Sequence, residues 1–304
     1  MYYPILRGKR HELSAVVELA NFPASRRCRP LLEPVNKNTN ELITCINDLH
    51  LKGISPYVVI NPDLGEFSGN GANIFQTLQQ NPASAGKFFP CVKILNAFDS
   101  TSLSLLQSYA GAAAYLVSDV SAAALPLLSQ SDCVFASPLR VAQPVLSAIP
   151  RVVLYEDYFA KQRRNADYPD VSFYSNFHFN YMQHPNAVGV ADFTVMGEEY
   201  QSAGGPAYVV AIHMTYVQRQ SVPSLYVKHF CSTTQVASPA NPGGKFLEAL
   251  RSLVLFDNNN SRFFDRTWGL AQFHVHHSNG HYPGLGIVKE LSVEHHMETI
   301  CNFI

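Results

Sequence analysis

The sequence predicts a TIM-like (β/α)8 barrel, and two observations carry this prediction. Eight short apolar runs follow one another between residues 2 and 195, and the first six are each followed by a segment with helical character. These runs are continuously apolar, which is typical of parallel strands that are buried on both faces. Eight repeats of strand and crossover indicate a closed parallel barrel. An open doubly wound sheet is the alternative, but the first turn, RGKRHE, is not the glycine-rich phosphate loop typical of that fold.

The eight expected strands cover residues 2–8, 29–35, 56–62, 88–95, 113–120, 132–139, 151–159 and 186–195. The helices after the first six strands are expected at 10–20, 39–53, 71–81, 99–111, 121–130 and 141–149. The helix at 39–53 has the clearest signals. Thr39 or Asn40 can cap it, and Gly53 can end it, with an apolar stripe made by Leu42, Ile43, Ile46 and Leu49.

The pattern changes after the seventh strand. Residues 160–186 are basic and then aromatic, and we expect a long loop there, lying over the C-terminal mouth of the barrel. Two further strand-like runs, 206–218 and 224–231, suggest a hairpin, although the first could instead be the eighth barrel strand. The remainder predicts a helix at 243–257, a histidine-rich loop at 269–286 and an amphipathic helix at 286–304, with Glu294, His295 and His296 on the surface. The whole chain, 1–304, is expected to be a single domain with C-terminal additions at about 220–304.

The composition argues against several classes of function, among them direct nucleic-acid binding, which it does not exclude. There are 22 Lys and Arg against 23 Asp and Glu, which argues against a broad nucleic-acid footprint. No apolar run reaches the ~18 residues that a membrane span requires, and the N-terminus does not resemble a signal peptide. Six cysteines without a CxxC motif predict reduced, buried thiols, so a cytoplasmic location is expected.

Polar residues end nearly every expected strand, and in a barrel these ends meet at one mouth. The candidate catalytic carboxylates are Glu33, Asp119, Glu156 and Asp192. The candidate ligand-binding residues are Arg7, Lys9, Asn61, Lys93 and Arg140. Such a ring of charges can supply acid–base chemistry on a small substrate or hold a divalent metal. It can equally be a buried salt-bridge network without chemistry.

No other motif specifies a reaction. The histidines of FHVHHSNGH (273–281) lack the spacing of a zinc site, so no metal is expected, and no cofactor motif is present. The basic KQRRN (161–165) and the aromatic residues after it fit a solvated loop packed on the barrel rim better than a nucleic-acid surface.

Three motifs together resemble the beta-protein family of bacteria and phages. They are Y-x-P-I-L-R-G-K-x-x-E over residues 2–12, PLLE over 30–33 and YVVINP over 57–62. The resemblance implies a component of a mobile or defence-associated gene set that has a protein partner, a nuclease or a phage component. It carries no catalytic residues to this chain; Arg7, Gly8, Lys9, Glu12 and Glu33 are the positions where the match lies.

Two functions from different classes follow as expectations. The first is an anti-phage defence or toxin-type component that binds a protein partner through the barrel mouth or a loop surface. The second is a barrel enzyme of the hydrolase or lyase class that acts on a small anionic or nucleotide-like ligand. In that enzyme Lys9, Lys93 and Arg140 bind the anion, while Glu33, Glu156 or Asp192 supplies the acid–base chemistry.

Overall fold

The computed structural model describes residues 1–69, 71–202, 204–205, 207–219, 222–234 and 236–304. Position 206 of the expected hairpin and positions 220, 221 and 235 of the expected C-terminal additions lie outside the described residues.

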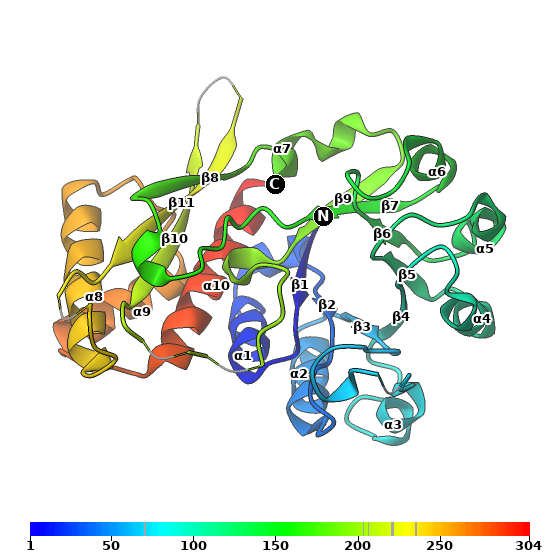
Figure 1. Cartoon of the computed structure of the whole chain (residues 1–304), viewed down its shortest axis with the longest axis horizontal. Helices are drawn as coiled ribbons and strands as arrows, with labels where there is room; N and C mark the ends of the chain where they lie inside the picture. The colour runs from blue at the N-terminus through cyan, green and yellow to red at the C-terminus, as the bar shows by residue number, and fades with distance from the viewer. Residues whose placement is uncertain (70, 203, 206, 220–221, 235) are drawn as a thin grey trace.

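Eight parallel strands close into a barrel, as the sequence predicts (Figure 1). They are β1 (Tyr2–Leu6), β2 (Leu31–Leu32), β3 (Tyr57–Val59), β4 (Phe89–Ile94), β5 (Ala113–Leu116), β6 (Val134–Ala136), β7 (Val152–Glu156) and β9 (Ala187–Asp192). β9 pairs with both β7 and β1, and this closes the cylinder. All eight predicted barrel strands are therefore confirmed.

The helices that follow the first six strands cover the outside of the barrel. They are α1 (Arg10–Leu19), α2 (Asn40–Leu51), α3 (Phe75–Gln80), α4 (Ser100–Ser108), α5 (Leu125–Leu128) and α6 (Gln143–Ala148). Each lies inside one of the six predicted helical segments. Asp99 caps α4, as its side chain accepts a hydrogen bond from the Ser102 amide.

Aromatic side chains fill the barrel interior. The ring of Phe135 packs edge-on against Tyr3 and against Tyr57, with centroids 5.6 Å apart in both pairs. Closer to the mouth, Tyr115 and Tyr155 pack with centroids 5.2 Å apart. The cylinder is thus a packed core, and any ligand site has to lie at its end.

The segment after β7 corrects one expectation. Residues 160–186 were expected to be a loop, but they contain β8 (Val171–Ser175) and α7 (Phe177–Asn180). β8 leaves the barrel and pairs antiparallel with β11 (Ser224–Cys231), which also pairs with β10 (Ala211–Gln218). The predicted hairpin is β10–β11. The alternative that its first strand completes the barrel is wrong, because that place belongs to β9.

Helices cover one face of this second sheet. Side chains of α8 (Pro242–Asn259), α9 (Trp268–Ser278) and α10 (Leu285–Phe303) pack with Ile212, Met214 and Phe230 into a separate apolar core. The expected helices at 243–257 and 286–304 are α8 and α10. The histidine-rich stretch expected as a loop at 269–286 is largely α9, which Thr267 caps by accepting a hydrogen bond from the Leu270 amide.

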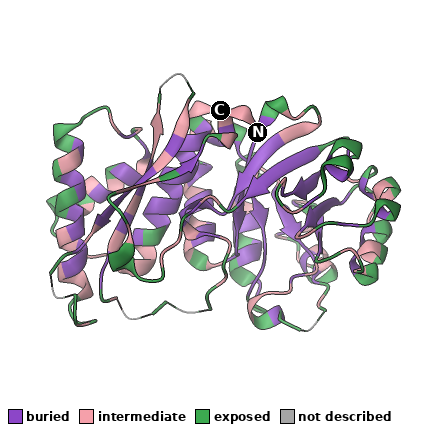
Figure 2. Cartoon of the chain, turned by 45° about the horizontal axis from the view of Figure 1, so that its top comes forward, coloured by how far each residue is buried: buried purple, intermediate pink, exposed green. Residues whose placement is uncertain are grey.

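α10 occupies the position of the eighth barrel helix. It packs against α1 and β1 on one side and against β10 and α9 on the other (Figures 1 and 2). The prediction that Glu294, His295 and His296 lie on the surface is therefore wrong: all three are fully buried. Residues 290–301 of this helix are all buried, and its two histidines there hydrogen-bond to Thr267 and Thr215.

Two further expectations concern the environment of the chain. All six cysteines are free thiols, and five are buried. Of the helices within the described ranges, none combines the length and the apolarity that crossing a bilayer requires.

Candidate functional site at the barrel mouth

The alternation of side chains along the strands brings four of the predicted residues to the inner side of the mouth. The inward residues of β1 to β4 include Ile5, Leu31, Val59 and Cys91. Arg7, Glu33, Asn61 and Lys93 each come two residues later along the chain, so they continue the same inward face beyond the packed core.

Glu33 is the centre of this group and is fully buried. Its Oε2 accepts a hydrogen bond from Nη1 of Arg7, and its Oε1 lies 2.6 Å from Nζ of Lys93. Gly8 makes this arrangement possible. A Cβ atom at Gly8, which has φ +63°, would lie only 3.1 Å from the carbonyl oxygen of Glu33. The RGK turn can therefore lie directly on the end of β2, and this places Arg7 beside Glu33.

Lys93 is held by two carboxylates and one amide. Besides Glu33, Asp63 Oδ1 lies 2.5 Å from its Nζ, and Asn61 bonds both its backbone amide and its carbonyl at 2.8 Å. Burial lowers the pKa of Lys93 from 10.5, although the hydrogen bond and charge of Asp63 oppose this shift. Asp63 is not among the candidate residues above, yet it follows the predicted strand 56–62 directly.

Arg140 reaches the mouth from the loop after β6. Its guanidinium makes two parallel hydrogen bonds to the carboxylate of Glu198, the first at 2.7 Å, and these raise the pKa of Arg140 further. The backbone carbonyl of Glu198 accepts a hydrogen bond from Arg7. Nothing in the sequence distinguished Glu198, because it belongs to a loop that follows the last barrel strand.

Lys9 lies at the edge of the mouth and is bound to an uncharged group, the carbonyl oxygen of Gln201. Burial lowers the pKa of Lys9, and the nearby cations Lys161 and Lys289 lower it further, while Glu12 opposes them. Lys161 donates to the carbonyl oxygen of Glu199 at 3.3 Å. Three lysines therefore gather at one edge of the mouth.

The other three predicted carboxylates do not join Glu33. Asp119 is exposed and accepts hydrogen bonds from the amides of Val120 and Ala142, which tie two loops together. Glu156 follows the inward-facing Tyr155, so it points out of the barrel, where the hydroxyl of Ser137 donates to it. The expectation of a shared ring of four carboxylates is thus corrected, because neighbouring strand residues face opposite sides.

Asp192 also points out of the barrel and forms a second buried polar cluster. It accepts hydrogen bonds from Tyr2 at 2.7 Å and from the Thr194 amide at 2.9 Å. His178 lies 2.7 Å and His296 3.3 Å from its Oδ2. Burial alone would raise the pKa of Asp192, but the charge of His296 and the hydrogen bonds of both histidines hold it well below 3.8.

The basic and aromatic segment after β7 packs on the second sheet. Tyr168 stacks on His229 with centroids 4.6 Å apart, and His229 in turn lies 2.8 Å from His213 between their Nδ1 atoms. Burial lowers the pKa of His213 to about 3 and that of His229 to about 4. Both imidazole rings are therefore neutral at pH 7. Residues 160–186 pack on these uncharged rings through Tyr168.

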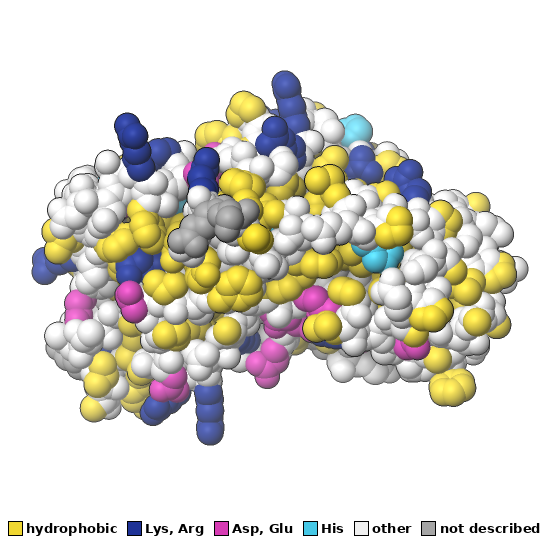
Figure 3. Space-filling model, turned by 90° about the horizontal axis from the view of Figure 1, so that it is seen from above, with side chains coloured by type: hydrophobic (Ala, Val, Ile, Leu, Met, Phe, Trp, Pro, Cys, Tyr) yellow, Lys and Arg dark blue, Asp and Glu magenta, His cyan; other side chains and the backbone are white. Residues whose placement is uncertain are grey.

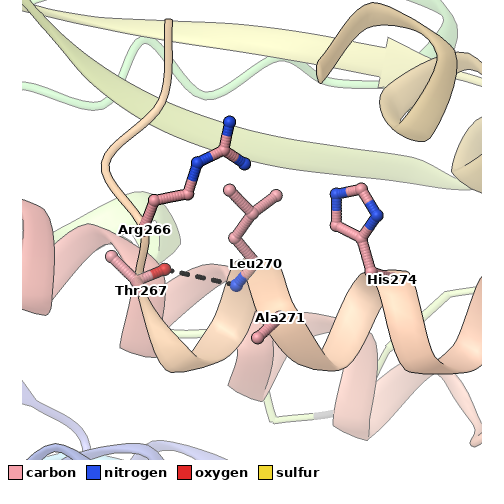
Figure 4. A pocket seen from close by; sticks show the side chains of 5 residues that line it. All are labelled: Arg266, Thr267, Leu270, Ala271 and His274. Atoms are coloured by element: carbon pink, nitrogen blue, oxygen red, sulfur yellow. Dashed lines mark hydrogen bonds between the residues drawn. The ribbon is translucent and has the colours of Figure 1, made fainter. Parts of the chain in front are cut away.

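Two hollows lie away from the mouth, on the second lobe. One, of about 390 Å³, is bordered by Arg266 and His274, which lie over the same side of α9 with Leu270 between them (Figure 4). Both side chains contact the buried Asp257, at 2.6 and 2.8 Å. The other, of about 360 Å³, follows α8. The residues that the structure describes contain no cluster of three His, Cys, Asp or Glu side chains able to hold a metal ion.

The surface has no large basic region on the face seen in Figure 3. Lys and Arg side chains lie mostly along the upper part of this view, singly or in twos, while the acidic groups lie mostly in its lower half.

The fold and the paired charges at its mouth define the class of this protein: a parallel eight-stranded (β/α)8 barrel with an added three-stranded sheet. Comparisons with family models, with curated proteins and with solved structures gave no match to this chain. The resemblance to the beta-protein family therefore stays a prediction.

Proposed function

We propose that the barrel mouth binds a small anionic ligand and that the chain is an enzyme of the hydrolase or lyase class. One observation carries this proposal: Arg7, Lys93 and Arg140 come from the ends of three separate strands and converge at the same mouth. Carboxylates offset these three cations. At the edge of the mouth Lys9 is held by the carbonyl oxygen of Gln201, and Lys161 is held by the carbonyl oxygen of Glu199 and, at 3.5 Å, by the carboxylate of Glu199. Cations gathered in this way attract anions.

Glu33 and Lys93 are the acid–base pair of the proposed reaction. They are 2.6 Å apart and buried, and burial lowers the pKa of Lys93 from its usual 10.5. Proton transfer is most efficient for groups whose pKa lies near the working pH. The Glu33 carboxylate is the partner that takes up or returns the proton.

Ligand binding is tested with the double variant Lys9→Ala/Lys161→Ala. A panel of phosphorylated and carboxylated metabolites is titrated by calorimetry and by thermal shift, at two salt concentrations. We expect a panel member that binds the wild type and binds this variant about tenfold or more weakly, because two cations near the ligand are lost. The matched control is Lys52→Ala, an exposed lysine at the far end of α2.

The reaction is tested with Glu33→Gln/Lys93→Met, which removes one charge of each sign. This variant should keep the fold and lose turnover of whichever panel member binds. Turnover that equals that of the wild type would exclude the acid–base roles. A panel without any ligand, for a folded wild type, would remove the binding proposal itself.

Protein binding is the second candidate, and a separate observation favours it. Leu139 and Phe98, in the loops after β6 and β4, are 85% and 92% exposed. Both loops follow barrel strands and therefore lie at the mouth, where these two side chains would supply the apolar part of a contact surface. The partner would be a nuclease or a phage component, as the family resemblance suggests, and a defence role is proposed on that ground alone.

This candidate predicts that Phe98→Ser/Leu139→Ser loses a partner that co-purifies with the wild type from its host. Leu51→Ser is the matched control, because Leu51 is 72% exposed at the end of α2, away from the mouth. A partner retained by the double variant would exclude these loops as the contact.

A further inference from the structure

The segment Gly197–Gln201 lies across the barrel mouth and is attached through side chains. Arg7 donates to the carbonyl oxygen of Glu198, and Lys9 donates to that of Gln201. The Glu198 amide donates to Oδ2 of Asp157 at 2.9 Å. The segment thus covers the same cations that were assigned above to a ligand.

Side chains, and not other backbone groups, hold the backbone of residues 198–201 in this segment. Residues 198–201 form no backbone-to-backbone hydrogen bond with the rest of the described chain. Segments without such bonds open at a low free-energy cost compared with strands and helices. When the segment opens, Arg7, Lys9 and Lys161 lose the carbonyl oxygens that they bind. The oxygens of a bound ligand can replace these carbonyl oxygens.

Glu198 makes the contacts that a bound carboxylate would make. Its two oxygens face the two terminal nitrogens of Arg140, and this fork geometry is specific for planar anions. The same carboxylate is close enough to Lys93 to favour the charged form of that amine. The Glu198 side chain is only partly buried, with 25% of its surface exposed, so it can leave the site without unfolding the barrel.

We propose that Glu198 occupies the anion subsite of the mouth in place of the ligand, and that the ligand carries a carboxylate which displaces it. This inference rests on the proposed function: it assigns a carboxylate as the class of substrate and Glu198 as the residue that regulates its binding. The free protein is then held closed by its own residue. The apparent affinity of the protein for the ligand is then scaled down to the fraction of molecules in which Glu198 has left Arg140.

The test uses Glu198→Ala and propionate, which reproduces the side chain that the variant lacks. Propionate should bind Glu198→Ala about tenfold or more tightly than it binds the wild type, because Arg140 is free only in the variant. Binding is measured by calorimetry, with sodium chloride at equal ionic strength as the salt control. The matched variant is Glu41→Ala, which removes an exposed carboxylate from α2, away from the mouth, and should behave as the wild type.

Two further variants make the result decisive. Glu198→Ala/Arg140→Met should lose the propionate binding that Glu198→Ala gains. Glu198→Gln keeps the size of the side chain, and it serves in place of Glu198→Ala should the alanine variant fold poorly. It should show a smaller gain in the same direction, since one oxygen of the fork is kept.

The outcomes separate this inference from the proposed function. Equal binding of a carboxylate by the wild type and Glu198→Ala would overturn the role of Glu198 and leave the mouth as a ligand site. Binding of inorganic phosphate but not propionate by Glu198→Ala would overturn the carboxylate class. Absence of binding by every variant, including to the wider panel, would overturn both.

Discussion

At the scale of single residues, Glu33 shows how this barrel accommodates charge in its interior. The carboxylate is fully buried and contacts one cation on each oxygen. Removing one member of such a group is far more harmful than removing a balanced pair, because the remaining charges stay buried without a partner.

We therefore expect Glu33→Ala to lower the free energy of unfolding by about 3–5 kcal/mol. Glu33→Gln/Lys93→Met should be less destabilised than Glu33→Ala, since Arg7 and Lys93 no longer repel each other. Urea unfolding monitored by circular dichroism measures both. Glu41→Ala, at an exposed position of α2, is the control and should change stability by less than about 0.5 kcal/mol. A Glu33→Ala protein as stable as this control would show that the buried charges are solvated by water.

Two carboxylates of α10 give a second prediction at this scale. Glu294 and Glu298 accept hydrogen bonds from the first amides of α9, Gly269 and Trp268, at 2.7 and 2.8 Å. Burial, and then the charge of Glu298, raise the pKa of Glu294 from 4.5 to about 9. The folded protein thus holds a proton at pH 7 that the unfolded chain has released.

Stability should therefore fall as the pH rises from 4.5 towards 9, which is the interval between the unfolded and folded pKa values of Glu294. The slope contributed by one proton is at most about 1.4 kcal/mol per pH unit. In Glu294→Gln this contribution should disappear, so the variant gains stability relative to the wild type at alkaline pH. Urea midpoints across this range measure it, with Glu41→Gln as the control. Parallel curves for wild type and Glu294→Gln would contradict the assignment.

At the scale of elements, α9 can meet α10 closely because Gly269 has no side chain. A Cβ atom there would lie 2.4 Å from the carbonyl oxygen of Leu291 and 2.8 Å from Oε2 of Glu294. Neither atom can move freely, since one belongs to the backbone of α10 and the other binds the start of α9.

Gly269→Ala should push α9 away from α10 and lower the melting temperature, with a loss of about 1–3 kcal/mol as for other overpacked sites. Gly205→Ala is the control, because nothing lies within 4 Å of a Cβ built at that position. A melting temperature unchanged by Gly269→Ala would mean that the two helices are not in direct contact.

At the scale of the whole molecule, the barrel and the second sheet share buried elements. In the chain, β8 comes between the barrel strands β7 and β9, but it pairs with β11 of the second sheet. α10 packs on the barrel and on the second sheet. The polar contacts continue across this boundary, because His296 lies 2.8 Å from Oγ1 of Thr215 in β10 and 3.3 Å from Oδ2 of Asp192 in β9.

The expected single domain leads to a prediction about unfolding. One unit should not open without exposing the apolar faces of the other, so differential scanning calorimetry should show a single transition with equal calorimetric and van't Hoff enthalpies. Two resolved transitions would mean that the second sheet and its helices are a separate domain.

The sequence by itself determined the barrel. Continuous apolar runs identify all eight strands, because a strand buried on both faces has to be apolar at every position. It also brought Arg7, Glu33, Asn61 and Lys93 to the same end of the barrel, since each is the first polar residue at or next to the end of its apolar run. Asp63, which directly follows the apolar run 56–62, could have been added to these residues on the same ground.

The tertiary structure alone decided which strand-end residues meet and how α10 is buried. Glu156 and Asp192 end apolar strands as Glu33 does, yet they face outward, and the inward or outward direction depends on the register of neighbouring strands. The sequence did not indicate α9 as a helix, because its apolar residues do not all lie on one face: Val275 is 47% exposed, while Leu270 and Phe273 are buried. Glu198 reaches Arg140 only because a closed cylinder gathers its loops at one end, so that residues distant in the chain become neighbours.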